Sequence, residues 1–513
     1  MQDNTILKHR TVSPLVCESA QEYILPDYCG DIRKILYTGA RAMPIGTFEG
    51  NGSAEFSGNV EYTVVYEDHE RRINSARFTS EYEMAVKCED EEYVNSYCDA
   101  NISTFSIRPV GPRKLSAKCT LSAAVGINER KSRNIEGDTF TYHTPELYER
   151  EIEHRTFECL TAPTREVHSE NMFIDGAIED DISVYLMSVT PRHLSYTVNE
   201  DGVEVKGEIL TKLLYKNGDA MPTEHEHVSD FCEQVEANTG AEFYLPRVRV
   251  GATKYNVEAR EDGVLVSTDV EYTTLLECYG NEKIGMVSDC YLCDYEVNNE
   301  YGEFYYTRLV GATSGEVTRE YEVPRESIDG ANIRNVIKAD ATSKINNVKI
   351  RDNSVEIEGV IRLSAITCEI NEDGTLSCGT TKFELPYKEN VKLDLQLSDN
   401  YRPECTVSVV NVDVDADAIA LYPVVTLSVN CLVLSDEKTP ILTASSTFGE
   451  ELLKEDGVVT VYYPDKGESL FSVAKKFHKE LVTLASDNAL SESAFATPYS
   501  SHSLEDVSSL LIT

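Results

Sequence analysis

One strand-like stretch occurs three times in this 513-residue chain, and its spacing limits what the chain can fold into. A glycine stands at the centre of each copy, at Gly58, Gly207 and Gly359. Apolar residues fall four and two positions before each glycine and two, six and seven positions after it. This is the period of a strand with one buried face. The glycines recur about every 150 residues, a domain-sized period that predicts three tandem β domains.

Two further landmarks keep the same period. One is an isoleucine near the start of each unit, at Ile32, Ile182 and Ile333. The other is a strand-like run that closes each unit, at residues 115–125, 266–276 and 422–432. Turn dipeptides of the hairpin type, such as Asp201-Gly202 and Asp373-Gly374, stand between the strand-like runs. We therefore expect a mainly β chain of three tandem antiparallel β-sandwich or barrel-like repeats.

The phase of the repeat sets the expected domain boundaries at residues 1–150, 151–297 and 298–453. We expect the aromatic-rich run 298–307 to be the first strand of the third unit, because aromatic side chains favour burial. The three repeated glycines are interpreted as structural, at a β-bulge or at a close backbone crossing. Segment 455–513 has a different pattern and is expected to form a fourth domain.

The chain is strongly acidic, with 47 Lys and Arg residues against 88 Asp and Glu residues and a formal net charge of -41. Such a chain repels phosphate backbones and anionic lipid surfaces, so we expect no nucleic-acid binding and no direct membrane insertion. No apolar run has the length of a signal peptide or of a membrane span. The 14 cysteines are dispersed, and several of them, such as Cys119, Cys278 and Cys431, lie in strand-like runs. The expectation is a cytoplasmic protein with reduced thiols.

Segment 455–513 combines strand and helix patterns. A short strand at 458–464 precedes a turn, and Ser469 can cap a helix by accepting a hydrogen bond from a free amide of the first turn. The apolar positions of this first helix follow a helical period: Leu470, Val473, Ala474 and Phe477. A second short helix ends near Asn488, and the apolar run 510–512 can pair with the first strand. The predicted order is β-α-α-β.

This segment resembles the LysM domain. The family pattern is matched at Tyr463, Gly467, Glu468, Ser469, Leu470, Val473, Ala474, Phe477, Leu484 and Asn488. The Gly that usually precedes the last strand and the Pro that follows it are absent. The resemblance implies a groove that binds N-acetylglucosamine-containing glycan or a protein partner. The groove residues that it implies are Gly467, Glu468, Ser469, Leu470, Asp487 and Asn488. The alternative is that Gly467 and Ser469 only cap a helix and that Asn488 only ends one.

The three β units followed by this segment resemble the SPOCS-domain coat proteins of spore-forming Clostridia. The resemblance is clearest at residues 25–36, Leu-Pro-Asp-Tyr-Cys-Gly-Asp-Ile-Arg-Lys-Ile-Leu, whereas the second unit lacks the Pro. It implies a morphogenetic protein that is made in the mother cell and located at the forespore surface and spore coat. The partners that it implies are the coat basement-layer ATPase or other coat proteins.

Three functions are open on the sequence. The first is a non-enzymatic scaffold or adaptor of spore-coat assembly, because repeated modules raise the effective concentration at a shared surface. The second is a peptidoglycan-binding cell-wall protein that uses the LysM-like segment. The third is a wall hydrolase that carries this segment for targeting. We expect no enzyme and no cofactor, because the sequence has no Walker loop, nucleophile elbow or HExxH motif.

Three local motifs could carry metal or redox chemistry. They are Cys290-Tyr-Leu-Cys293, His225-Glu-His227 and Asp413-Val-Asp-Ala-Asp417. The first has no second CxxC, and the second has no third ligand nearby. The third lacks the glycine and the final glutamate of a calcium loop. We interpret all three as structural and expect no metal site.

Overall fold

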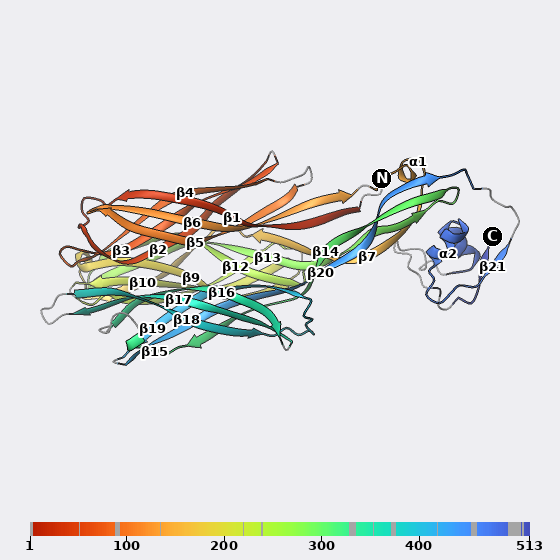
Figure 1. Ribbon diagram of the computed structural model, residues 1–513. Coiled ribbons are helices and arrows are strands. Elements are labelled where there is room, and N and C mark those ends of the chain that lie inside the picture. Colours follow the sequence, from red (N-terminus) through yellow and green to blue (C-terminus); the bar gives the residue numbers. More distant parts are fainter. Residues whose placement is uncertain are drawn as a thin grey trace.

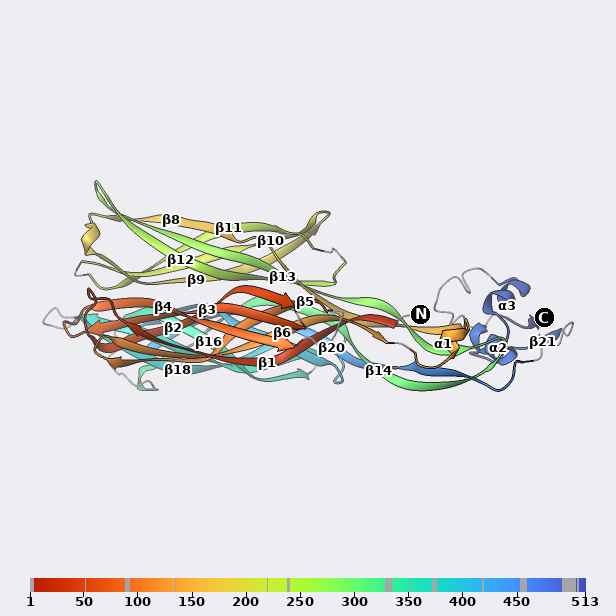
Figure 2. The same cartoon turned by 90° about the horizontal axis from the view of Figure 1, so that it is seen from above.

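The computed structural model describes residues 4–50, 52–87, 93–133, 135–218, 220–237, 240–327, 335–351, 353–370, 376–417, 419–452, 459–490, 504 and 507–513. Long strands form a bundle of sheets at one end of the molecule, and a narrower stalk leads to a small helical module at the other end (Figure 1 and Figure 2). The named strands pair antiparallel throughout. The prediction of a mainly β chain with several antiparallel sheets is confirmed.

Each repeated glycine lies in the middle strand of a three-stranded sheet. The middle strands are β3 (Ser53–Asp68), β10 (Gly202–Asn217) and β17 (Ser354–Ile370). They are flanked by β2 (Ile32–Gly50) and β4 (Ile73–Lys87), by β9 (Ile182–Asn199) and β11 (Thr223–Val235), and by β16 (Asn335–Arg351) and β18 (Leu376–Val391). The apolar residues around each glycine are buried, as the strand period requires.

The closing runs lie in the middle strands of a second set of sheets. These strands are β6 (Lys114–Arg133), β13 (Gly263–Tyr291) and β20 (Ala420–Phe448). Their partners are β1 (Asn4–Ile24) and β5 (Tyr93–Gly111); β7 (Glu146–Thr161), β8 (Arg165–Asp175) and β12 (Phe243–Arg260); and β14 (Glu296–Glu320), β15 (Val323–Pro324) and β19 (Arg402–Ala416). Short helical turns are α1 (Thr139–Tyr142), η1 (Glu179–Asp181) and η2 (Arg325–Ser327).

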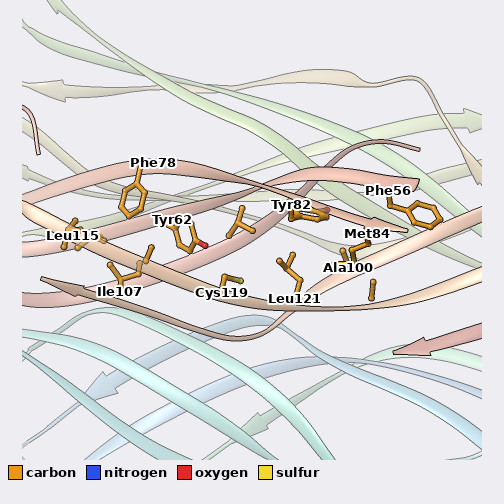
Figure 3. Close-up of a cluster of buried hydrophobic side chains, with 14 of the residues drawn as sticks. Phe56, Tyr62, Phe78, Tyr82, Met84, Ala100, Ile107, Leu115, Cys119 and Leu121 are labelled. Atoms are coloured by element: carbon orange, nitrogen blue, oxygen red, sulfur yellow. The ribbon is translucent and has the colours of Figure 1, made fainter. Parts of the chain in front are cut away.

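The two kinds of sheet pack face to face around an apolar core. In the first pair of sheets, Phe56 and Tyr82 of the glycine sheet share a cluster with Leu115 and Leu121 of the closing sheet (Figure 3). Separate clusters fill the second and third pairs of sheets. Burial of apolar surface on both inner faces is what holds such a sandwich together.

The middle-strand glycines are needed because an aromatic ring of the next strand covers each of them. The rings lie directly opposite: Tyr82 faces Gly58, Phe231 faces Gly207 and Tyr387 faces Gly359. A Cβ atom at Gly359 would lie 2.3 Å from the carbonyl oxygen of Lys344 and 2.5 Å from the Tyr387 ring. The strand on the other side of Gly359 also has a register shift, between Ile345 and Asn347. A bulge and a close approach therefore occur together at this glycine.

The stalk is made of β7, the N-terminal part of β14 and the C-terminal parts of β13 and β20, the last two being strands of 29 residues each (Figure 2). The run 298–307 lies in β14, as expected for a strand. Its aromatic side chains alternate: Phe304 and Tyr306 pack on the stalk core, whereas Tyr301 and Tyr305 are exposed. Beyond the stalk lie β21 (Thr460–Tyr462), α2 (Leu470–Phe477), α3 (Leu481–Asp487) and β22 (Leu510–Ile512).

A shared apolar core, built from equivalent positions of the repeat, joins the three sandwiches. It holds the residue seven positions after each glycine, namely Val65, Leu214 and Ile366. The residue six positions after each glycine instead belongs to its own sandwich: Val64, Leu213 and Ala365. The apolar pair seen in every copy thus serves two cores, one inside a sandwich and one between sandwiches. The shared core also holds Leu36, Leu186 and Ile337.

Buried charges lie beside this shared core. The side chain of Lys338 on β16 is 3 % exposed, and its Nζ lies 2.9 Å from Oε1 of Glu224 on β11. Tyr37 of the first sandwich donates a hydrogen bond to the carboxylate of Asp340. Burial and the negative charge of Asp340 raise the pKa of Tyr37 well above its ordinary value. Polar side chains of all three sandwiches are therefore bonded to one another at this junction.

The expectation of reduced thiols is wrong for one pair of cysteines, and the expected domain boundaries stay predictions. Cys368 and Cys378 face each other across β17 and β18 and form a disulfide, with Cα atoms 4.2 Å apart. The expectation of reduced thiols is therefore wrong for this pair, because strand pairing brings together two residues that are 10 positions apart in the sequence. The domain boundaries stay predictions, and the one at residues 150 and 151 falls inside β7. Some expected features lie outside the described residues: Ile333, the turn Asp373-Gly374, and the boundary residues 453 and 455.

Candidate functional site

The C-terminal module (residues 459–513) folds around β21 and β22, which pair antiparallel, with α2 and α3 between them in sequence. Ser469 precedes α2 and accepts a hydrogen bond from the backbone N–H of Ser472 at 3.1 Å. The hydroxyl of Ser472 accepts one from the backbone N–H of Ser469 at 3.0 Å. This reciprocal pair satisfies two amide groups that a helix start leaves free.

The capping role of Ser469 gives a direct test. We expect Ser469→Ala to lower the free energy of unfolding of the module by about 1 kcal/mol, because the Ser472 amide loses its acceptor. Ser469→Asp should retain the stability of the parent, because aspartate caps helices as well as serine does. Chemical denaturation monitored by circular dichroism measures both variants. Equal stability of the alanine variant and the parent contradicts the capping role.

The core of the module is formed by one face of each helix and by the inward residues of the two strands. Its buried members are Leu470, Phe471, Val473, Ala474, Leu481, Leu484, Ala485, Leu504, Leu510 and Ile512. The helical period that the sequence shows from Leu470 to Ala474 accounts for the buried face of α2. Phe477 is only partly buried and packs at the edge of this cluster.

Leu470→Ala should cost the module about 2–5 kcal/mol of unfolding free energy, because a fully buried leucine leaves a cavity. Val482→Ala is the matched control, since Val482 lies on the exposed side of α3 and should change stability little. Thermal melting of the full chain reports both effects. A Leu470→Ala variant that melts like the Val482→Ala variant contradicts this register of the helix.

Asn488 joins the end of α3 to β22. Its side-chain amide donates hydrogen bonds to the carbonyl oxygens of Leu484 and Leu511, each at 2.8 Å. Its side-chain oxygen accepts one from the backbone N–H of Leu511 at 2.6 Å. All three bonds hold the module together, so this side chain acts as a structural clamp.

The implied groove residues do not come together at one place. A pocket of about 520 Å³ is lined by Gly467, Glu468 and Ser469, but not by Asp487 or Asn488. Gly467 has a φ of 85°, a conformation that glycine adopts without strain. The Leu470 side chain is buried in the core and cannot reach the pocket. The Asp487 carboxylate accepts a hydrogen bond from the Thr513 hydroxyl.

Glu468 is also engaged within the turn before α2. Its carboxylate accepts hydrogen bonds from the hydroxyl of Tyr462, at 3.0 Å, and from the backbone N–H of Asp465, at 2.9 Å. The ammonium of Lys476 lies 4.6 Å above the centre of the Tyr462 ring. The rest of the pocket lining from the module offers hydroxyl and backbone groups together with the charged side chains of Asp465 and Lys466.

The module is fixed to the end of the stalk, and two stalk residues complete the pocket. These residues are Tyr148 on β7 and Asp289 on β13. The Tyr148 ring lies 5.2 Å from the Phe471 ring, and Asp289 forms an ion pair with Lys475 at 2.6 Å. Tyr291 donates a hydrogen bond to the carbonyl oxygen of Lys479 at 2.7 Å. Sequence reasoning missed these stalk residues, because only the fold brings them to the module.

The outward side of the strand pair in the module is apolar and exposed. We call this surface the outer strand face. Its residues are Val459, Val461, Tyr463 and Leu511, which are 44–72 % exposed. The alternate residues Tyr462, Leu510 and Ile512 face the core of the module. Strand alternation thus gives a short sheet with two apolar sides, of which one is covered by the module itself.

Residues 332–419 match the family model described as SipL, SPOCS domain. The third unit carries a SPOCS domain. Strands β16 to β19 lie within this match, together with the repeated glycine Gly359. Searches of curated proteins and of solved structures gave no match. The SPOCS domain indicates a sporulation-related protein.

The SPOCS domain contributes to the junction between the sandwiches. Lys338 on β16 pairs with Glu224, and Ile366 on β17 enters the shared core. The first and second units present equivalent positions there, although the family match covers neither of them. Within the described parts of the chain, no helix is long and apolar enough to cross a membrane.

Two of the three local motifs take part in the hydrogen bonding and packing of the fold. The buried thiol of Cys290 donates to Ser445 Oγ at 3.3 Å, and Cys293 borders the core of the module. The carboxylate of Asp417 accepts hydrogen bonds from the backbone N–H groups of Ile419 and Ala420 in the turn before β20. The described residues contain no cluster of three or more His, Cys, Asp or Glu side chains suited to a metal ion.

Proposed function

We propose that the chain is a non-enzymatic scaffold of spore-coat assembly that docks on a coat protein of the forespore surface, with the basement-layer ATPase as the first candidate. The SPOCS domain supports the sporulation setting. The observation that carries the docking role is the outer strand face. An exposed apolar surface of this kind is typical of a protein interaction site. The partner would bury the side chains of Val461, Tyr463 and Leu511.

The backbone of this face also suits an extended partner segment. Asn488 bonds both backbone groups of Leu511, so these groups face away from β21. Val461 lies opposite Leu511, and its own backbone N–H and C=O therefore face away from β22. An added strand could bond these groups while its alternate side chains cover the apolar face. The net charge of -41 favours a partner segment that carries Lys or Arg.

The attachment of the module to the stalk supports a scaffold role. Tyr148, Asp289 and Tyr291 contact α2 through Phe471 and Lys475, so the outer strand face is presented at the far end of a long molecule (Figure 1). Three sandwiches at the other end offer separate surfaces for other coat proteins. Joining such sites in one chain raises the local concentration of one partner near another.

The test is binding of the immobilised full chain to the purified ATPase, with Val461→Asp and the control Val482→Asp. Both valines are more than half exposed, but Val482 lies on α3, outside the outer strand face. We expect Val461→Asp to weaken binding about tenfold or more, because a buried carboxylate without a partner is costly. Val482→Asp should bind like the parent, and both variants should melt like it. Equal binding by both variants contradicts docking at this face.

A second candidate function is binding of peptidoglycan through the pocket beside Gly467. The pocket of about 520 Å³ favours it, since its hydroxyl and backbone groups can bond sugar hydroxyls. Sedimentation of the full chain with purified peptidoglycan tests this function. If the chain sediments with the glycan and does not bind the ATPase, the scaffold proposal is replaced by this one. If it binds only the ATPase, this second candidate is removed.

A further inference from the structure

Two cysteines face each other across β19 and β20 in the third unit. Cys405 lies directly opposite Cys431, and their sulfur atoms are 3.3 Å apart. Both are free thiols. Cys431 is fully buried in the core of the third sandwich, whereas Cys405 is partly exposed. Cys405 is therefore the more accessible member of the pair.

The same chain contains a disulfide with the same strand relationship. Cys368 and Cys378 also lie directly opposite each other, on β17 and β18, and they are bonded. Directly opposed residues of antiparallel strands have Cα atoms about 4.5–5.5 Å apart, which lies within the range that disulfides span. Oxidation of Cys405 and Cys431 would need only a small approach of the two sulfur atoms, to about 2.05 Å.

We propose that Cys405 and Cys431 are a second cross-strand disulfide site, oxidised by thiol–disulfide exchange with a low-molecular-weight disulfide. The Cys405 thiolate first attacks that disulfide, forms a mixed disulfide and releases one small thiol. Cys431 then attacks the Cys405 sulfur and releases the second small thiol. The two cysteines are oxidised, the small disulfide is reduced, and their two protons go to the released thiols.

The two thiols of the pair differ in acidity and in access to solvent. The S–H of Cys405 donates a hydrogen bond to the sulfur of Cys431. This hydrogen bond lowers the pKa of the Cys431 thiol. The same hydrogen bond, together with burial, raises the pKa of Cys405, so oxidation should be faster at higher pH, where a larger fraction of Cys405 is thiolate. Burial of Cys431 excludes the small disulfide. Cys431 should therefore attack the mixed disulfide at Cys405 rather than form a second mixed disulfide.

The bond would join a strand inside the SPOCS domain match to a strand outside it. Cys405 lies inside the SPOCS domain, whereas Cys431 lies on β20, the strand that continues along the stalk toward the C-terminal module. Residues next to the pair, Thr406 and Asn430, line a cavity of about 880 Å³ to which all three sandwiches contribute. Oxidation would tie the last strand of the SPOCS domain to the stalk strand at this cavity.

The experiment uses the full chain, incubated with oxidised glutathione, alkylated with iodoacetamide and digested for mass spectrometry. We expect a peptide that links Cys405 to Cys431 and a higher thermal midpoint of the oxidised chain. Cys405→Ser should abolish both the linked peptide and the rise in midpoint. Cys17 and Cys119 are an internal control, because they lie on paired strands but two positions out of register. They should remain alkylated and unlinked.

Two results would overturn the proposal. One is recovery of Cys405 and Cys431 as separate alkylated residues after full exposure to oxidised glutathione. The other is a stable glutathione adduct at Cys405 without a link to Cys431, which would mean that the buried thiol does not resolve it. Because the linked peptide is measured on the parent chain, both results are decisive even if a variant folds poorly.

Discussion

Gly359→Ala is expected to lower the free energy of unfolding by about 3 kcal/mol. The added methyl carbon would lie 2.3 Å from the carbonyl oxygen of Lys344, a main-chain atom of the neighbouring strand. It would also lie 2.5 Å from the ring of Tyr387, a residue of β18, the strand on the other side of β17. Neither neighbour is the free end of a flexible chain, so one of the flanking strands must move. The loss arises from repacking of the sheet.

Gly315→Ala is the matched control for this effect. Gly315 also lies in a strand of the third unit, but a Cβ atom there would meet nothing within 4 Å. We expect its stability to equal that of the parent within experimental error. Guanidinium denaturation of the two variants and the parent gives the comparison. Equal midpoints for all three chains would show that the glycine is not required at the centre of β17.

Lys338→Met is expected to cost about 3 kcal/mol, because it removes one partner of a buried ion pair and leaves the other. The Lys338 side chain is 3 % exposed, and its Nζ lies 2.9 Å from a buried oxygen of Glu224. The same ammonium donates to Ser188 Oγ at 3.2 Å. Both partners belong to the second sandwich, so the substitution should loosen the second sandwich from the third.

Lys438→Met is the control, because Lys438 also forms an ion pair in the third unit, with Glu303, but its side chain is 59 % exposed. Exposed ion pairs contribute little to stability, and we expect no measurable change. Calorimetry of the full chains measures both variants. The Lys338→Met chain should unfold at a lower temperature, with separate transitions for the sandwiches. An unchanged single transition in that variant would contradict the role of this pair in joining them.

The strand pattern could be predicted from the sequence, because period-two burial leaves a direct trace in the residues. The positions around Gly58, Gly207 and Gly359 lie in middle strands, and their apolar neighbours are buried. The aromatic cover of the glycines could not be predicted. Tyr82 and Phe231 each follow their glycine by 24 residues, but Tyr387 follows its glycine by 28, so only the pairing of the strands identifies all three rings as equivalent.

In the sequence, the junction between the sandwiches appears only as an irregularity in the alternation of apolar and polar residues. A half-buried strand should alternate, yet each copy has two consecutive apolar residues, such as Val64 and Val65. The second residue enters the core that the three sandwiches share. The sequence therefore contained the signal, but the way in which the sandwiches pack could not be deduced from one strand. The pairing of Lys338 with Glu224 depends on that packing and left no local trace.

In the C-terminal module, too, the local features could be predicted from the sequence and the long-range contacts could not. Ser469 as a helix cap and the buried face of α2 follow from local rules that act within a few residues. The attachment through Tyr148 and Asp289 involves residues far away in the sequence, and no local pattern predicts it. Asn488 was expected either in a groove or at a helix end. It lies at the helix end, where its side chain also clamps β22.

The most direct test of the scaffold proposal is the location of the full chain, fused to a fluorescent protein, in sporulating cells of a spore former. The parent chain should gather around the forespore, and the Val461→Asp chain should be spread through the mother cell at equal abundance. The Val482→Asp chain should gather like the parent. A parent chain found along the cell wall, or spread evenly through the mother cell, would contradict the proposed docking at the forespore surface.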